Sequence, residues 1–165
     1  MKLQLLLSLT RQAIDTYHMI EDGDHVAVGL SGGKDSLALL YALHHLQRFY
    51  PKKYTLSAIT VDLGLGNMQM EPIEALCREF GVPWFLVPTQ IGQILFDIKK
   101  EANPCSLCAK MRKGALNQKA KAMGCNVIAY AHHRDDVIET LLMSLFYEGR
   151  CHCFSPKSDR SHVVL

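Results

Sequence analysis

The chain has 165 residues, of which 48% are hydrophobic and 21% are charged, and its net charge is +2. This composition indicates a globular domain with a substantial core and excludes collagen-like and disordered chains. The small net charge also excludes a chain that is basic throughout, so any contact with nucleic acid must be local. No apolar run reaches the ~18 residues that a membrane span needs. In a chain expected to be cytoplasmic, the six cysteines are interpreted as thiols or metal ligands.

Helical and strand patterns alternate along the chain. An amphipathic helix comes first and ends near Gly23, and Arg11 interrupts its apolar start too early for a signal peptide. Strands are then predicted at 25–30, 56–62, 84–88 and 126–131, and helices at about 34–48, 69–80, 90–100, 106–123 and 134–148. This order predicts an α/β fold: a single domain over residues 1–165, with a parallel sheet and helices on both faces. Residues 161–165 begin like a further strand, which indicates either a chain truncated before a C-terminal segment or a short edge strand.

The first motif, Ser-Gly-Gly-Lys-Asp-Ser at residues 31–36, lies between the first predicted strand and the next helix. A tight Gly-Gly turn there brings backbone N–H groups, a lysine and two hydroxyls to one point at a helix N-terminus, which favours a phosphate. The alternative is an ordinary turn in which Ser31 is the N-cap. A Walker A loop is excluded because Asp35 follows Gly33-Lys34 where that motif needs Ser or Thr.

The second motif, His132-His133-Arg134-Asp135-Asp136, follows the strand at 126–131. Because ligands bind at the carboxyl ends of parallel strands, we expect this run to lie beside the phosphate loop. Two carboxylates next to a triphosphate favour an intervening Mg²⁺, which takes oxygen ligands, and His133 could donate to a phosphate or transfer a proton. The alternative is that acidic residues in a first helical turn only stabilise the helix dipole.

The third motif, Pro104-Cys105-Ser106-Leu107-Cys108, opens the helix at 106–123. A Cys-x-x-Cys pair serves zinc, redox and iron–sulfur sites, and the following cations favour thiolates. The alternative is a pair of half-buried structural cysteines.

The other cysteines are expected to lie elsewhere. The helix that starts at Arg134 covers ~20 Å before Cys151 and Cys153. We therefore expect these two thiols near the opposite edge of the sheet, unable to complete a metal site with the Cys-x-x-Cys pair. Cys77 and Cys125 are expected in the core.

Together the three motifs resemble the PP-loop ATP pyrophosphatases, in particular the tRNA 2-thiocytidine synthetase-like branch. The similarity extends over nearly the whole chain and includes Phe146-Tyr147-Glu148-Gly149-Arg150. It implies a Rossmann-like, adenine nucleotide alpha hydrolase-like fold and an ATP-dependent transferase. Such an enzyme adenylates the C2 oxygen of a cytidine in the tRNA anticodon loop, releases pyrophosphate and lets sulfur replace AMP. The resemblance also implies a sulfur donor such as a cysteine desulfurase, a cytoplasmic location and a homodimer, for which the first helix is apolar enough.

The resemblance assigns roles to individual residues. It implies that Asp62 lies near the nucleoside and that Arg112 and Asp136 match a catalytic cation and carboxylate. From the second motif itself we add His133 as an ATP-binding residue and Asp135 as a catalytic one. The residues that the resemblance implies for the ATP phosphates are Ser31, Gly32, Gly33, Lys34, Asp35 and Ser36. It also makes Cys105 and Cys108 two ligands of a [4Fe-4S] cluster whose third cysteine lies outside this chain. We therefore expect this chain alone to bind ATP and Mg²⁺ but to lose the cluster.

Two other functions remain open at this point. One is a ligase similar to lysidine synthetase, against which the paired cysteines argue, since that chemistry needs no sulfur carrier. The other is a PP-loop ATP-binding module without catalysis. Conversion of ATP to AMP and pyrophosphate in the presence of tRNA distinguishes these alternatives.

Overall fold

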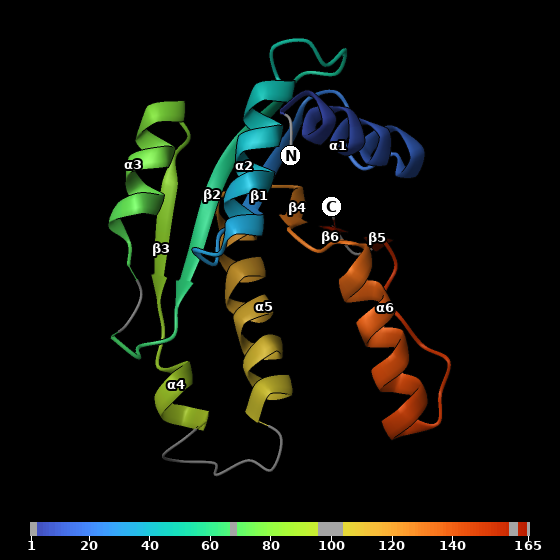
Figure 1. Ribbon diagram of the computed structural model, residues 1–165. Helices are drawn as coiled ribbons and strands as arrows, with labels where there is room; N and C mark the ends of the chain where they lie inside the picture. Colours follow the sequence, from blue (N-terminus) through green and yellow to red (C-terminus); the bar gives the residue numbers. More distant parts are fainter. Residues whose placement is uncertain (1–2, 67–68, 96–103, 159–161, 165) are drawn as a thin grey trace.

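The computed structural model describes residues 3–66, 69–95, 104–158 and 162–164, and its centre is a six-stranded sheet in the order β3-β2-β1-β4-β6-β5 (Figure 1). The strands are β1 (Asp24–Gly29), β2 (Tyr54–Asp62), β3 (Trp84–Pro88), β4 (Val127–Tyr130), β5 (Lys157–Ser158) and β6 (His162–Val164). Neighbouring strands are parallel except that β5 is antiparallel to β6. The predicted α/β fold is confirmed, and the antiparallel edge strand was missed because two residues show no periodicity.

Helices cover both faces of the sheet (Figure 1). On one face lie α1 (Leu3–Tyr17), α2 (Lys34–Leu46) and α3 (Glu71–Phe80), and on the other lie α4 (Ile91–Gln93) and α5 (Pro104–Ala122). The part of the predicted helix 90–100 beyond residue 95 lies outside the described residues. Among those residues no helix is both long and apolar enough to cross a bilayer.

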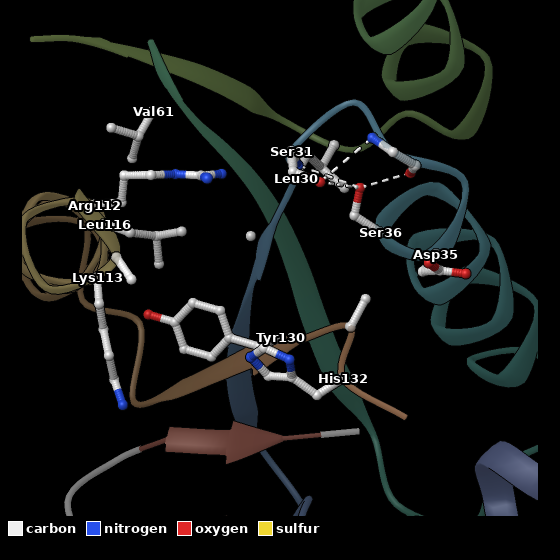
Figure 2. Close-up of a pocket in the computed structure, with 14 residues that line it drawn as sticks. Leu30, Ser31, Asp35, Ser36, Val61, Arg112, Lys113, Leu116, Tyr130 and His132 are labelled. Atoms are coloured by element: carbon white, nitrogen blue, oxygen red, sulfur yellow. Dashed lines mark hydrogen bonds between the residues drawn. The ribbon is translucent and has the colours of Figure 1, made fainter. Parts of the chain in front are cut away.

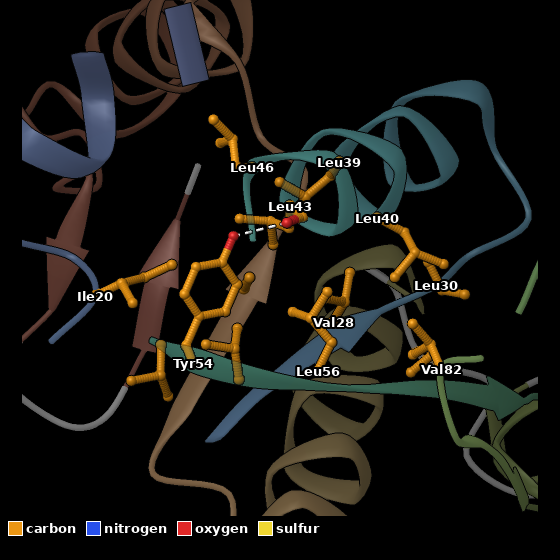
Figure 3. Close-up of a cluster of buried hydrophobic side chains, with 14 of the residues drawn as sticks. Ile20, Val28, Leu30, Leu39, Leu40, Leu43, Leu46, Tyr54, Leu56 and Val82 are labelled. Carbon is orange, nitrogen blue, oxygen red and sulfur yellow. Dashed lines mark hydrogen bonds between the residues drawn. The ribbon is translucent and has the colours of Figure 1, made fainter. Parts of the chain in front are cut away.

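The larger core lies between α2 and the central strands (Figure 3). Leu40, Leu43 and Leu46 are completely buried there because their three-residue spacing places them on one helix face. The Tyr54 hydroxyl donates to the Leu43 carbonyl at 2.6 Å, and burial raises the pKa of this phenol. The second core, on the α5 face, includes Ile59, Leu116 and Ile128. These two cores hold the carboxyl ends of β1, β2 and β4 in place.

The last helix, α6 (Arg134–Met143), does not pack on the sheet. None of its residues is buried, and it extends past the carboxyl ends of the strands (Figure 1). It continues into a π-helical segment, η2 (Ser144–Glu148), whose Phe146 and Tyr147 are 78% and 79% exposed. The chain then returns toward the sheet in β5.

This course corrects the predicted position of Cys151 and Cys153. The prediction assumed that the helix from Arg134 runs back along the sheet. Instead Phe154, next to Cys153, contacts His132 with ring centroids 5.2 Å apart. The segment therefore returns to the carboxyl end of β4, and the expectation of the opposite edge is wrong. Both thiols are exposed.

Candidate functional site

A cavity of about 420 Å³ opens at the carboxyl edge of the sheet (Figure 2). Four segments far apart in the sequence form it: the loop after β1, the end of β2, one face of α5 and the end of β4. Its wall consists of Gly29, Leu30, Ser31, Gly33, Asp35, Ser36, Val61, Ala109, Arg112, Lys113, Leu116, Tyr130, Ala131 and His132. Ser31, Gly33, Asp35 and Ser36 were predicted to bind ATP and Arg112 to be a catalytic cation, and the structure brings these five together.

The buried hydroxyl of Ser36 organises the loop. It donates to the Gly33 carbonyl at 2.9 Å and accepts from the Ser31 backbone N–H at 3.2 Å. Gly32 has φ +81°, a backbone conformation that side chains rarely adopt, so the turn needs glycine at this position. Gly33 is the N-cap of α2 and makes no side-chain cap, so the alternative that Ser31 caps the helix is wrong. The N-terminus of α2 therefore faces the cavity with its positive dipole end.

Of the two charged residues in the phosphate loop, Asp35 lines the cavity and Lys34 points to solvent. Asp35 is in its wall, whereas Lys34 and Gly32 are not. The Lys34 side chain is 86% exposed, and its Nζ lies 2.8 Å from Asp35 Oδ1. This hydrogen bond lowers the pKa of the Asp35 carboxyl, which therefore stays ionised at neutral pH. The carboxylate at the cavity is thus partly neutralised by the lysine of the same loop.

Two cations of α5 line the cavity, and Arg112 faces the phosphate loop. In Figure 2 the Arg112 side chain extends from α5 toward the loop. Lys113 lies with its Nζ 5.8 Å from the centre of the Tyr130 ring. The Tyr130 hydroxyl donates to Asn117 Oδ1 at 2.8 Å, and burial raises the pKa of this phenol to about 12. The wall therefore combines two cations, one carboxylate and a neutral tyrosine, a charge balance that suits an anion.

The sequence analysis gave no role to Lys113, Tyr130 or His132, although His132 belongs to the run that was expected beside the phosphate loop. Each is adjacent to a predicted site segment: Lys113 follows Arg112, and the other two lie where the strand at 126–131 ends. Their position at the carboxyl end of a parallel strand, or one residue from a predicted cation, was the signal that could have found them.

The His-His-Arg-Asp-Asp run lies next to the cavity but contributes only His132 to its wall. Asp136 Oδ2 accepts the backbone N–H of His133 at 2.8 Å and lies 3.6 Å from His132 Nδ1. Asp136 thus supports the start of α6, in agreement with the helix-terminus alternative. Asp135 is exposed and His133 lines a neighbouring cavity. Asp35 is therefore the carboxylate at the first cavity that could hold Mg²⁺ together with phosphate oxygens.

Asp62 has a local structural role. Its Oδ1 accepts the Gly64 backbone N–H at 2.9 Å, and its carbonyl accepts the Thr89 hydroxyl at 2.6 Å. These bonds fix the turn after β2, and Asp62 itself does not line the cavity, whereas Val61 does.

The Cys-x-x-Cys pair near the site supplies at most two ligands for a metal ion or cluster. Cys108 is half-buried and packs against the second core, and Cys105 lies one helical turn earlier in α5. Within the described part of the chain, no three His, Cys, Asp or Glu side chains are grouped as a metal site. An iron–sulfur cluster needs at least three protein ligands, so the described residues do not complete one and we derive no step through it.

A second cavity of about 760 Å³ adjoins the first, because Asp35, Ala131 and His132 line both. Its remaining wall is mostly apolar and comes from α1, α2, α6 and the returning segment at Phe154 and Pro156.

Comparison with known proteins decides the family. The sequence model described as "PP-loop domain" matches residues 6–156. The chain belongs to the PP-loop domain family. The resemblance drawn from the three motifs is thereby confirmed. Among curated relatives of this PP-loop protein, a tRNA-cytidine(32) 2-sulfurtransferase of Syntrophotalea carbinolica is 41% identical over 164 residues, which cover 95% of this chain and 62% of the relative. The same-named protein of Vibrio vulnificus is 39% identical over 160 residues, covering 94% and 52%.

Solved structures agree with the fold. The U34-tRNA thiolase NcsA from Methanococcus maripaludis, solved with its [4Fe-4S] cluster, matches with a TM-score of 0.74 at 25% identity over 99% of this chain and 58% of that one. An NH3-dependent NAD synthetase from Campylobacter jejuni matches with a TM-score of 0.59 at 15% identity, covering 82% and 59%, and shows the fold alone. This PP-loop chain spans between 52% and 62% of the length of the two curated relatives named above.

Proposed function

We propose that the chain is the ATP-binding part of an ATP-dependent tRNA sulfurtransferase that acts on a cytidine. The observation that carries this proposal is the cavity in which the Ser31–Ser36 loop faces Arg112 and His132. The names of the curated relatives and of the thiolase neighbour support the same reaction class. We place the triphosphate over the loop and the N-terminus of α2, with Mg²⁺ between its oxygens and Asp35.

The proposed reaction has two steps. The cytidine O2 attacks the α-phosphorus, the bond to the bridging oxygen of the β-phosphate breaks, and pyrophosphate leaves. A sulfur nucleophile then attacks C2, the C2–O bond breaks, and AMP leaves with the oxygen. Arg112 and the dipole of α2 stabilise the charge that develops on the phosphate oxygens during the first step.

The sulfur comes, in this proposal, from a cysteine desulfurase, and the reaction takes place in the cytoplasm, where tRNA is modified. A [4Fe-4S] cluster, when bound through Cys105, Cys108 and a further ligand, would supply the sulfur-carrying chemistry. The exposed Leu3, Leu5 and Leu9 of α1 fit the proposed homodimer, because they leave apolar surface available for a second copy.

The test measures the products of ATP with and without added unmodified tRNA. AMP and pyrophosphate in equal amounts, formed only with tRNA, support the proposal. Arg112→Gln should lower this rate about 100-fold, since removal of one preorganised group that stabilises transition-state charge costs that much. Arg48→Gln, at the exposed end of α2, is the matched control and should keep the rate. Formation of ADP, unchanged ATP, or pyrophosphate release that requires a free amino acid instead of tRNA would each contradict the proposal.

A further inference from the structure

Helix α5 has an unusual charge distribution. It contains five basic residues, Lys110, Arg112, Lys113, Lys119 and Lys121, and no acidic residue. The whole chain is nearly balanced, with 18 basic and 16 acidic residues. A solvated helix surface normally mixes both signs at i, i+4 spacing, which stabilises the helix. A single-signed helix loses that stabilisation. Lys119 and Lys121 favour the helix dipole in the last turn, but the cations of the N-terminal half do not, so their charge calls for another explanation.

The five cations separate into two groups by direction. Arg112 points into the cavity, and Lys119 lies with its Nζ 5.0 Å from the centre of the Phe85 ring on β3. Lys110, Lys113 and Lys121 are exposed. With Asn117 between them they fall at intervals of three or four residues, so they share one helix face. We call Lys110, Lys113 and Lys121 the lysine stripe.

The lysine stripe runs along α5 from Lys121, near the amino-terminal end of β4, to the mouth of the cavity at Lys113. From Lys110 to Lys121 the helix rises about 16 Å. Lys113, within the stripe, also lines the cavity. In Figure 1 the N-terminal half of α5, which carries Lys110, extends past the carboxyl ends of the strands. A linear polyanion on this face would therefore pass directly by the proposed reaction site.

No member of the lysine stripe has an ion-pair partner among the described residues. The ammonium groups of Lys110 and Lys121 are therefore available to neutralise phosphates and release their condensed counterions, which is the main source of affinity for nucleic acids, while the Lys113 Nζ lies 5.8 Å from the centre of the Tyr130 ring. The other exposed positions on this side include Gly114 and Gln118, which offer no apolar anchor. Protein interfaces are depleted of lysine and rely on buried aromatic or apolar anchors, so this surface fits a phosphate backbone better than a protein.

We infer that the lysine stripe is the docking surface for the RNA backbone, and that it leads one nucleotide to the cavity at Lys113. This inference rests on the proposed function and adds the surface that holds the substrate. Lys110 and Lys121 contact only phosphates, so they contribute affinity without reading the base sequence.

The test measures binding of a fluorescently labelled, unmodified tRNA anticodon stem-loop by the full chain in the absence of ATP, over a series of salt concentrations. The double variant Lys110→Gln/Lys121→Gln should bind more weakly, and the slope of log K against log salt should decrease in size by about two. Gln has nearly the same helix propensity as Lys, so α5 should stay folded. The matched control Arg48→Gln/Lys53→Gln removes two exposed charges from the amino-terminal end of the sheet and should keep the slope.

An unchanged slope in the stripe variant, or an equal decrease in both variants, would overturn the inference, the latter because it would reveal only an attraction to overall charge. The pyrophosphate assay separates this outcome from failure of the proposed function. In that assay the stripe variant should show a raised KM for tRNA and an unchanged kcat. A chain that binds RNA through the stripe but releases no pyrophosphate would keep this inference and contradict the proposed function. A chain that releases pyrophosphate with tRNA but shows an unchanged salt slope in the stripe variant would keep the proposed function and contradict this inference.

Discussion

At the scale of single residues, Ser36 has more influence on the site than its small side chain suggests. Its hydroxyl is 4% exposed and joins both ends of the phosphate loop through Gly33 and Ser31. Ser36→Ala removes two hydrogen bonds, although the Gly33 carbonyl keeps the Leu37 backbone N–H at 3.2 Å, so we expect the free energy of unfolding to fall by about 1–3 kcal/mol. Urea denaturation measures this change. Ser31→Ala is the control and should cost less than about 1 kcal/mol, since that exposed hydroxyl makes two long bonds of 3.3 Å, one accepted from the Gly33 N–H and one donated to the Ser36 hydroxyl. Equal losses in the two variants would contradict this role.

The cysteines should differ sharply in reactivity because their burial differs. Burial raises the pKa of the Cys77 thiol to about 11, whereas Cys151 and Cys153 are exposed. At pH 8, iodoacetamide should therefore label the exposed pair in the native chain and Cys77 only after unfolding, as mass spectrometry of the peptides can show.

The raised pKa of Cys77 also determines how the free energy of unfolding changes with pH. The thiol ionises at lower pH in the unfolded chain, so Cys77 should make the folded state less stable as pH rises from 9 to 11. Fast native labelling of Cys77 would contradict its place in the core.

At the scale of elements, α2 and α6 show that similar apolar patterns can have different structural consequences. Leu43 of α2 is completely buried, whereas Leu142 of α6 is 43% exposed. Leu43→Ala should lower the free energy of unfolding by about 2–5 kcal/mol because it leaves a cavity in the core. Leu142→Ala should change it by less than about 0.5 kcal/mol. Thermal or urea unfolding of both variants checks this contrast, and a large loss for Leu142→Ala would mean that α6 packs against another surface.

The same contrast explains what the sequence could predict. The strands at 25–30, 56–62 and 84–88 were found to within two residues, because continuous apolar runs between helical patterns are specific for a parallel sheet. The direction of α6 could not be found this way. Its Val137, Ile138 and Leu141 repeat like a buried face, yet none is buried. Periodicity shows that a face is apolar but not what covers it, and the misplacement of Cys151 followed from that limit.

The candidate site was predictable where its chemistry is local. The phosphate loop is continuous in sequence, and a glycine pair before a helix has few other uses. Arg112 came from resemblance alone, and Tyr130 was missed, because their meeting depends on how α5 packs across β4. Asp136 shows how one residue can fit two roles. A carboxylate in a first helical turn can cap the helix or bind a metal ion, and only the bond to the His133 N–H distinguishes the two.

At the scale of the whole molecule, the cavity joins segments from four parts of the chain, so a nucleotide bound there connects the halves of the sheet through its own contacts. A ligand that binds only the folded chain stabilises it, by about 2.7 kcal/mol at a hundred times its Kd. For a domain of this size, ATP with Mg²⁺ at that excess should raise Tm by roughly 5 to 10 °C. Differential scanning calorimetry with increasing ATP measures the shift. Arg112→Gln should reduce it, because the guanidinium reaches the cavity from α5, while Arg48→Gln should preserve it. A Tm independent of ATP, or an equal shift in Arg112→Gln, would mean that the loop and α5 do not share one ligand.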